Sequence, residues 1–141
     1  MIVTLRNKLR WLLLRPYYTL LTKFYKMDIA KSAIISLGAK LDKTYPRGIH
    51  IGNESYIASG ALVFSHDYAR SLHTDTYIGK KSFIGANSII MPGVTIGDSV
   101  IVGAGTVVTK DVPSGCIVVG NPAKIIKKNI TTIQYGKLSN D

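Results

Sequence analysis

Residues 78–107 read IGKKSF-IGANSI-IMPGVT-IGDSVI-VGAGTV, a run of six-residue blocks that each open with Ile or Val. The same spacing extends in both directions, and the aliphatic series comprises Ile51, Ile57, Val63, Ile78, Ile84, Ile90, Ile96, Val102 and Val108. A small residue often follows directly, as at Gly52, Ala58, Gly79, Gly85, Gly97 and Gly103, and a second column from Ser55 to Val112 stands four places on. A fixed period of this kind is the signature of a repeat architecture.

The period of six predicts a β-solenoid. It matches neither 3.6 nor 3.5 residues per turn, whereas two inward-facing positions in every six residues suit short strands joined by bends. Stacked coils would hydrogen-bond to one another about 4.8 Å apart and share one aliphatic core. Ile29, Ile35 and Leu41 continue the spacing upstream, and a four-residue insertion separates Leu41 from Ile51.

These blocks resemble the hexapeptide-repeat acyltransferases, and the resemblance runs from about Ile29 to Lys128. It implies an all-β, left-handed parallel β-helix. The period itself does not give the hand, and the usual right-handed crossover would favour the opposite one. The chain is most similar to the small acetyltransferases of sugars, antibiotics and surface-polysaccharide precursors. Because such proteins are typically homotrimers that use acetyl-CoA as acyl donor, we expect both for this chain.

The 141 residues fit a single domain. We expect an amphipathic basic helical prefix over residues 1–27, the β-helix domain over residues 28–128 and a C-terminal tail over residues 129–141. Hydrophobic residues make up 46% of the chain, so it can bury a core. The single cysteine, Cys116, excludes an intramolecular disulfide, suits a reducing compartment and is expected to pack near the last coil.

The prefix interleaves apolar and basic residues, and Pro16 predicts a break between two short helices. Its longest uninterrupted apolar run, Trp11 to Leu14, is far shorter than the ~20 residues that span a bilayer, and it lacks the pattern of a signal peptide. We therefore expect a cytoplasmic protein. Two roles for the prefix stay open and are compatible: a helix lying on anionic lipid and a cap on the open end of the repeat.

The net charge of +10 indicates an affinity for anions without naming one. Basic residues gather at the two ends of the chain, in the prefix and at Lys124, Lys127 and Lys128. No recognition helix or aromatic RNA-binding signature accompanies them, so we do not expect nucleic-acid binding. Phosphate-bearing cofactors and acidic lipid remain as partners.

An excursion, FSHDYARSLHTDTY, interrupts the period between Val63 and Ile78. Acyl transfer from a thioester needs a base with a pKa near neutrality, and histidine suits that work. The Ser-His-Asp segment at residues 65–67 resembles the family's catalytic histidine, which lies before such a loop at a subunit boundary, so the resemblance implies His66 as general base. If Leu72 opened a further side of the coil with Thr76 in its second column, His66 would stand at a corner.

Neighbouring polar residues are weaker candidates. His73, Asp67 and Asp75 are candidate contacts of the acceptor, and either aspartate could also orient the imidazole of His66, so the orienting group stays open. His50 is expected to point to solvent. Where small family members often place an acceptor-binding asparagine, the resemblance aligns Gly60 of this chain, which implies a different recognition of the acceptor.

Coenzyme A needs backbone edges for its pantetheine arm and cations for its phosphates. The resemblance implies cofactor contacts at Ala86, Ala104, Thr109 and Lys110, and at Lys124 and Lys127, where relatives often have arginine. Lysine keeps the charge and loses the bidentate geometry. The alternative for these lysines is a solvated basic end.

Three other functions are less consistent with this sequence. A covalent acyl-enzyme at Cys116 or a serine is disfavoured, because the resemblance implies direct attack within a ternary complex. A zinc enzyme of the carbonic-anhydrase kind would need three histidines across a subunit boundary, and a purely structural β-helix would need no site; no metal is expected. The favoured acceptor is a sugar hydroxyl or amine, of a free or lipid-linked sugar, in surface-polysaccharide assembly at the inner membrane face.

Overall fold

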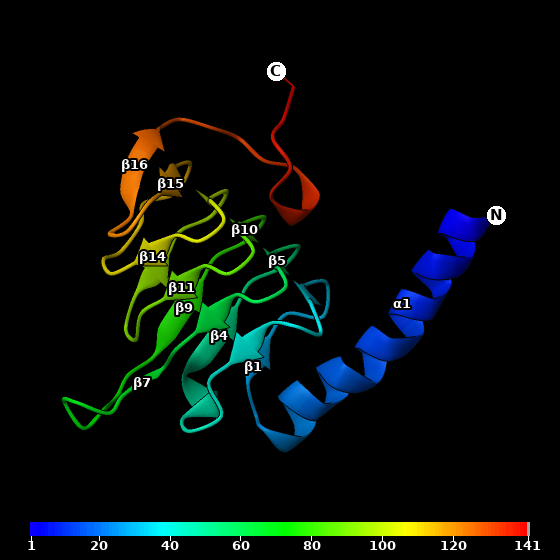
Figure 1. Ribbon diagram of the computed structural model, residues 1–141, viewed down its shortest axis with the longest axis horizontal. Helices are drawn as coiled ribbons and strands as arrows, with labels where there is room; N and C mark the ends of the chain where they lie inside the picture. Colours follow the sequence, from blue (N-terminus) through cyan, green and yellow to red (C-terminus); the bar gives the residue numbers. More distant parts are fainter. Residues whose placement is uncertain (141) are drawn as a thin grey trace.

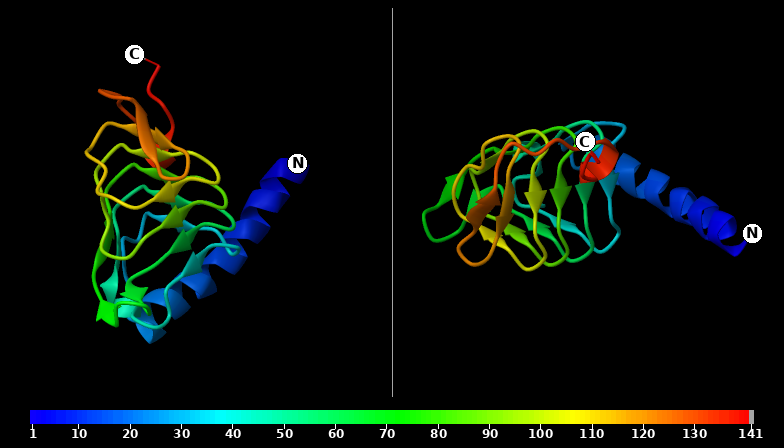
Figure 2. Two further views of the ribbon diagram at one scale, coloured as in Figure 1. Left: turned by 60° about the vertical axis from the view of Figure 1, so that its left-hand side comes forward. Right: turned by 90° about the horizontal axis from the view of Figure 1, so that it is seen from above.

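The computed structural model describes residues 1–140 and shows a helix followed by a stack of β-coils (Figure 1). The helix α1 (Ile2–Thr19) runs into a π-helical turn, η1 (Leu20–Phe24). Each coil then contributes short strands to three sheets, which form the sides of a prism, and the coils rise from the prefix toward the C-terminus (Figure 2). The predicted left-handed parallel β-helix with a helical prefix is confirmed.

The strands of the three sheets are parallel and in register, except β16 of sheet B. Sheet A contains β1 (Asp28–Ile29), β4 (Ile49–Ile51), β9 (Thr76–Ile78) and β12 (Thr95–Ile96). Sheet B contains β2 (Ile34–Ile35), β5 (Tyr56–Ile57), β10 (Phe83–Ile84), β13 (Ile101–Val102), β15 (Ile117–Val119) and β16 (Lys124–Lys127). Sheet C contains β3 (Lys40–Leu41), β6 (Leu62–Val63), β11 (Ile89–Ile90) and β14 (Val107–Val108). The chain runs from A to B to C in each coil, so sequential strands meet at three corners.

The aliphatic columns face the interior of the prism. The first column is fully buried at Ile57, Ile84 and Ile90, and its members pair in register from coil to coil, as Ile84 does with Val102. The second column includes buried hydroxyls, and these are satisfied by backbone carbonyls, as Ser55 Oγ is by Gly79 O at 2.6 Å. Burying hydroxyls costs little when each finds a partner.

The small residues of the repeat have a packing role. A side chain at Gly79 would place its Cβ 2.5 Å from the carbonyl oxygen of Gly97 in the next coil, so the coils approach too closely there for a Cβ atom. Positive φ occurs two places later instead, at Lys81 (51°) and at Ser99 (52°). Each bend therefore needs a backbone with positive φ at one position and a residue without a large side chain at another.

The prefix differs from its predicted form. A single helix passes through Pro16 where a break was expected. Proline removes one backbone donor, and burial of Leu14 before it and of Leu21 after it anchors the helix on both sides. Tyr18 donates its hydroxyl to Ile29 O at 2.8 Å, so the end of the prefix lies on the first coil. Residues 1–13 are exposed and the helix leads away from the first coil toward its N-terminus (Figure 2), although Arg10 donates to the hydroxyl of Tyr56 in β5 at 3.1 Å.

The last coil closes differently. β16 turns back antiparallel on β15, and Cys116 is buried just before β15, as expected. Residues 130–138 then fold back down sheet B, where Thr132 Oγ1 donates to Lys81 O at 2.6 Å and Tyr135 N donates to Glu54 O at 2.7 Å. The tail thus adds to the wall of the prism.

Candidate active site

The excursion forms a β-hairpin that projects from the corner between sheets C and A (Figure 1). Its strands are β7 (His66–Asp67) and β8 (Leu72–His73), and they pair antiparallel with His66 opposite His73. Leu72 is 45% exposed, so the expectation that it opens a further side of the coil is wrong. The antiparallel pairing explains the difference, because it returns the chain to the corner without adding a side.

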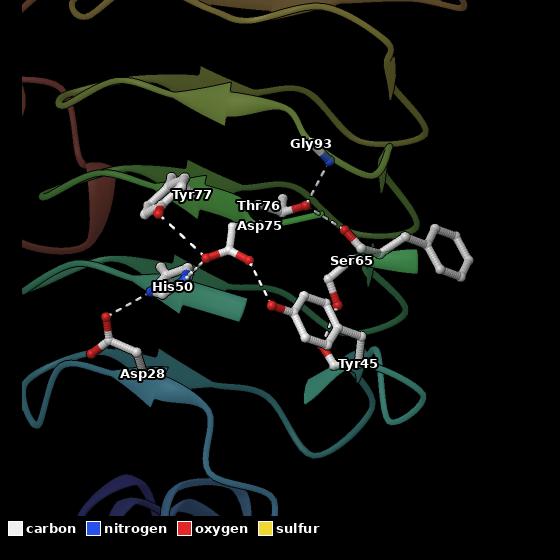
Figure 3. Close-up of polar contacts among 9 residues, drawn as sticks. Asp28, Tyr45, His50, Ser65, Asp75, Thr76, Tyr77 and Gly93 are labelled. Atoms are coloured by element: carbon white, nitrogen blue, oxygen red, sulfur yellow. Dashed lines mark hydrogen bonds and ion pairs between the residues drawn. The ribbon is translucent and has the colours of Figure 1, made fainter. Parts of the chain in front are cut away.

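Buried hydroxyls fasten the base of the hairpin to the coils. Ser65 Oγ donates to the carbonyl of Tyr45, and Thr76 Oγ1 donates to Phe64 O at 2.6 Å and accepts from Gly93 N at 3.0 Å (Figure 3). Ser65 and Thr76 are each fully buried. The hairpin base is therefore fixed to the coils below and above it, and His66 starts from a rigid position.

Asp42 holds the imidazole of His66. Its Oδ2 lies 2.5 Å from His66 Nδ1, and the carboxylate also accepts backbone N–H groups from Thr44 at 2.8 Å, Ser65 at 2.9 Å and His66 at 3.0 Å. The Asp42 side chain is 2% exposed, whereas that of His66 is 26% exposed. A buried carboxylate thus fixes a partly accessible histidine.

The electrostatics favour a charged Asp42. Burial alone would raise the pKa of this carboxyl, but the hydrogen bonds from Ser65 N, the His66 side chain and Thr44 N outweigh it and lower the pKa below its usual range. A carboxylate accepts only, so Nδ1 of His66 carries the hydrogen. The lone pair of a neutral imidazole then lies on Nε2, the atom that can accept a proton. Within residues 1–140, no side chain or backbone group hydrogen-bonds to Nε2.

Asp42 was missed because it precedes His66 by 24 residues and belongs to no motif. It directly follows β3, at the same corner as the hairpin and one coil below it, because Leu41 pairs with Val63. The signal available in the sequence was the column itself: Leu41 and Val63 occupy equivalent positions, so residues just after them meet at one corner. The four-residue insertion after Leu41 obscured that equivalence.

The prediction that His50 points to solvent is wrong, because both of its ring nitrogens have partners. It bridges Asp28, 2.8 Å from Nδ1, and Asp75, 2.9 Å from Nε2, and its ring stacks on Tyr77 at 4.3 Å (Figure 3). The register explains this: Asp28, His50 and Tyr77 are paired neighbours in successive strands of sheet A. Burial would lower the pKa of His50, but hydrogen bonds to the two carboxylates outweigh it and raise that pKa.

The aspartates proposed as acceptor contacts already have partners. The carboxylate of Asp67 accepts a hydrogen bond from Arg70 Nε at 2.6 Å. The carboxylate of Asp75 hydrogen-bonds to His50 Nε2 and accepts the hydroxyl of Tyr45 at 3.0 Å. Neither contacts His66, whose imidazole is hydrogen-bonded by Asp42 instead. His73 is exposed beside His66 on the hairpin, and its ring stacks on Tyr45 at 5.0 Å. Contact of these residues with an acceptor stays a prediction.

The residues predicted to contact coenzyme A divide into three groups. Ala86 and Ala104 lie one above the other at the corner between sheets B and C, where Gly105 N donates to Ala86 O at 2.9 Å. Thr109 and Lys110 follow β14, at the corner that carries His66 but two coils higher. Lys124 and Lys127 are exposed on β16, at the top of the stack. Gly60 lies one coil below Ala86, facing the side chain of Asn87.

The two corners lie on opposite edges of sheet C. Ala104 precedes β14 (Val107–Val108) and Thr109 directly follows it, so the width of the sheet lies between them. A single chain therefore presents the two sets of candidate contacts apart from each other. Among residues 1–140, no three His, Cys, Asp or Glu side chains form a group that could hold a metal ion.

A left-handed β-helix of six-residue repeats, with a hydrogen-bonded histidine at a coil corner, defines a hexapeptide-repeat protein of the transferase type. Residues 75–110 match the family described as bacterial transferase hexapeptide (six repeats). Protein CapG of Staphylococcus aureus is 40% identical over 131 aligned positions that cover 77% of this chain and 76% of CapG. The chain belongs to the hexapeptide-repeat acyltransferase family.

Other relatives agree with this assignment. The putative acetyltransferase YvoF of Bacillus subtilis (strain 168) is 38% identical over 105 residues, which cover 73% of this chain. The chain spans 61% of the length of YvoF. The crystal structure of a maltose O-acetyltransferase from Clostridium difficile 630 superposes with a TM-score of 0.59 at 26% identity and covers 83% of this chain and 87% of that one.

Proposed function

We propose that this protein transfers an acetyl group from acetyl-CoA to a hydroxyl or amine of a sugar, with His66 as general base. The observation that carries the proposal is the Asp42–His66 pair, in which a buried carboxylate fixes one imidazole nitrogen and leaves Nε2 open at a coil corner. Family membership supplies the class of reaction, and the pair supplies the group that the reaction needs.

In the proposed reaction, His66 Nε2 accepts the proton of the acceptor hydroxyl while the acceptor oxygen attacks the thioester carbonyl. Asp42 stabilises the imidazolium that forms. When the tetrahedral intermediate collapses, the carbon–sulfur bond breaks and His66 returns the proton to the departing thiolate. The products are the acetyl ester and coenzyme A, and His66 ends in its starting state.

The donor would lie along the stack, with its thioester at His66 and its phosphates toward the basic end. Lys124 and Lys127 suit the phosphates as exposed cations on β16. Ala86 and Ala104 offer a small-residue corner where a pantetheine arm can approach backbone closely, and Thr109 and Lys110 offer polar contacts above His66. The chemistry of these residues fits acetyl-CoA as a substrate.

A homotrimer would complete the site. The corner with Ala86 and Ala104 and the corner with His66, Thr109 and Lys110 lie on opposite edges of sheet C in one chain. A neighbouring copy that presents one corner to the other would bring both sets around one donor. The projecting hairpin, which carries His66, would then reach toward the neighbouring copy and place His66 at the subunit boundary.

The setting we propose is surface-polysaccharide assembly at the cytoplasmic face of the membrane. Residues 1–13 of α1 expose Trp11 and several leucines together with Arg6, Lys8 and Arg10, a composition suited to anionic lipid. No helix within residues 1–140 is long and apolar enough to cross a membrane. Peripheral contact through α1 would bring the site close to lipid-linked sugars.

Release of free thiol from acetyl-CoA, measured with a panel of saccharides and sugar nucleotides, tests this function. We expect acceptor-dependent release together with an acetylated product detected by mass spectrometry. Pre-treatment with a metal chelator should leave the rate unchanged. Hydration of carbon dioxide that is lost on chelation would favour the zinc enzyme, and absence of coenzyme A binding would favour the structural role.

A further inference from the structure

A groove of about 560 Å³ runs along the outer face of β3, below the hairpin. It is bounded at one end by the corner at Leu37 and Gly38, and at the other by the corner at Asp42. Tyr17 of the prefix forms its lower side and Leu62 its upper side. The walls are therefore largely apolar and aromatic, with enough volume for a sugar.

The groove adjoins the catalytic pair. Asp42 and Phe64 line it, and both contact His66: the carboxylate through Nδ1, and the Phe64 ring edge-on with centroids 6.4 Å apart. The groove lies on the N-terminal side of His66, whereas Lys124 and Lys127 lie at the opposite end of the stack. A donor that extends from those lysines to His66 would leave this groove to the acceptor.

Two lysines give the groove a positive charge. Lys40 and Lys43 line it and are exposed. Within residues 1–140, neither has a carboxylate within 4.0 Å of its ammonium group, and Lys43 Nζ instead lies 5.5 Å from the ring centroid of Tyr25. The acidic residue of the lining, Asp42, is buried and committed to His66 and backbone N–H groups. An anion entering here would meet two uncompensated cations.

We propose that this groove binds the acetyl acceptor and that the acceptor is a phosphate-bearing sugar. The sugar ring would lie against Phe64 and Leu62, and its phosphate would bind Lys40 and Lys43. Ammonium groups bind phosphate as point charges without a fixed geometry, which suits two lysines on adjacent segments of chain. A sugar nucleotide and a lipid-diphosphate sugar share this chemistry. This inference rests on the proposed acetyl transfer.

The test compares three acceptors: N-acetylglucosamine, its 1-phosphate, and its uridine-diphosphate form. A fourth arm presents the diphosphate sugar on a lipid in vesicles, which separates a soluble from a lipid-borne source. We expect lower KM values for the phosphorylated forms than for the neutral sugar. In Lys40→Ala and Lys43→Ala, the KM for phosphorylated acceptors should rise about tenfold, the fold-change of a weakened charge contact of about 1.4 kcal/mol, with kcat and coenzyme A affinity nearly unchanged.

Lys80→Ala is the matched control, because Lys80 is an exposed lysine on the corner between sheets A and B. Equal KM values for neutral and phosphorylated sugars in the wild type, or a KM unaffected by both groove substitutions, would overturn the inference and leave acetyl transfer standing. Binding of pyrophosphate, followed by chemical-shift changes at Lys40 and Phe64, is a readout independent of turnover. Pyrophosphate binding without any thioester consumption would support the groove and refute the proposed function.

Discussion

Asp42 carries most of what is specific about the site. Its carboxylate accepts from four backbone N–H groups, those of Thr44, Tyr45, Ser65 and His66, and from His66 Nδ1, so it fixes both the hairpin base and the tautomer of the histidine. These contacts lower its pKa against the effect of burial. The residue that hydrogen-bonds the proposed base thus also ties the hairpin to the coil below.

Asp42→Asn should reduce kcat without a matching loss of coenzyme A affinity. An amide at this position can donate to Nδ1, which would place the hydrogen on Nε2 and remove the acceptor lone pair that the reaction needs. We expect a fall toward the loss caused by removing the base, about a hundred- to ten-thousand-fold. Asp98→Asn, at the corner between sheets A and B, is the control and should retain normal turnover. A kcat close to that of the wild type in Asp42→Asn would remove Asp42 from the mechanism.

The His50 bridge predicts a pH-dependent stability. Because its pKa is raised in the fold, the bridge contributes most below the unfolded-state value near 6.5, and this contribution is lost as the pH rises through the folded pKa. His50→Gln should therefore lower Tm more at pH 6 than at pH 9, measured by calorimetry. Asp28→Asn, which removes one of the two carboxylates, should cause a smaller pH-dependent loss of Tm in the same direction. An equal loss at both pH values would show that packing against Tyr77 alone matters.

At the scale of the elements, the prefix (residues 1–27) has two parts with different surroundings. Residues 14–27 lie on the first coil and include buried Leu14, Leu21 and Met27, whereas residues 1–13 are exposed. Deleting residues 1–13 should weaken sedimentation with anionic vesicles and leave the melting temperature nearly unchanged. Neutral vesicles are the control, because the charge attraction is absent there. Equal sedimentation of both forms with anionic vesicles would contradict the membrane role and leave the prefix with contacts to the coils alone.

The strands could be predicted because their signal is local and repeated. Every predicted aliphatic position from Ile29 to Val102 lies in the core or at its edge, since period and burial express the same geometry. Side-chain contacts between coils are harder to predict, because the insertions obscure which residues of successive coils are equivalent. Asp42 meets His66, and Asp28 meets His50, only once the coils are stacked. Likewise, Pro16 predicted a break that packing on both sides prevents.

At the scale of the whole molecule, the separated corners predict an oligomer. Light scattering at micromolar concentration should give three times the chain mass of 15.4 kDa. Mixing two inactive chains tests whether the site is shared: His66→Ala supplies an intact Ala104 corner, and Ala104→Trp supplies an intact His66. Refolding the two together should restore part of the activity. A monomer mass, or no recovery on mixing, would place the whole site within one chain.

The central claim is that His66 acts as the base in acetyl transfer, and the kcat of His66→Ala at saturating acetyl-CoA and acceptor tests it most directly. The account predicts that kcat falls about a hundred- to ten-thousand-fold, while the Kd for coenzyme A, set mainly by remote contacts such as Lys124, changes little. Circular dichroism would establish that the β-helix is intact. Near-normal turnover in a folded His66→Ala protein would contradict the account and make His73, its partner across the hairpin, the next candidate.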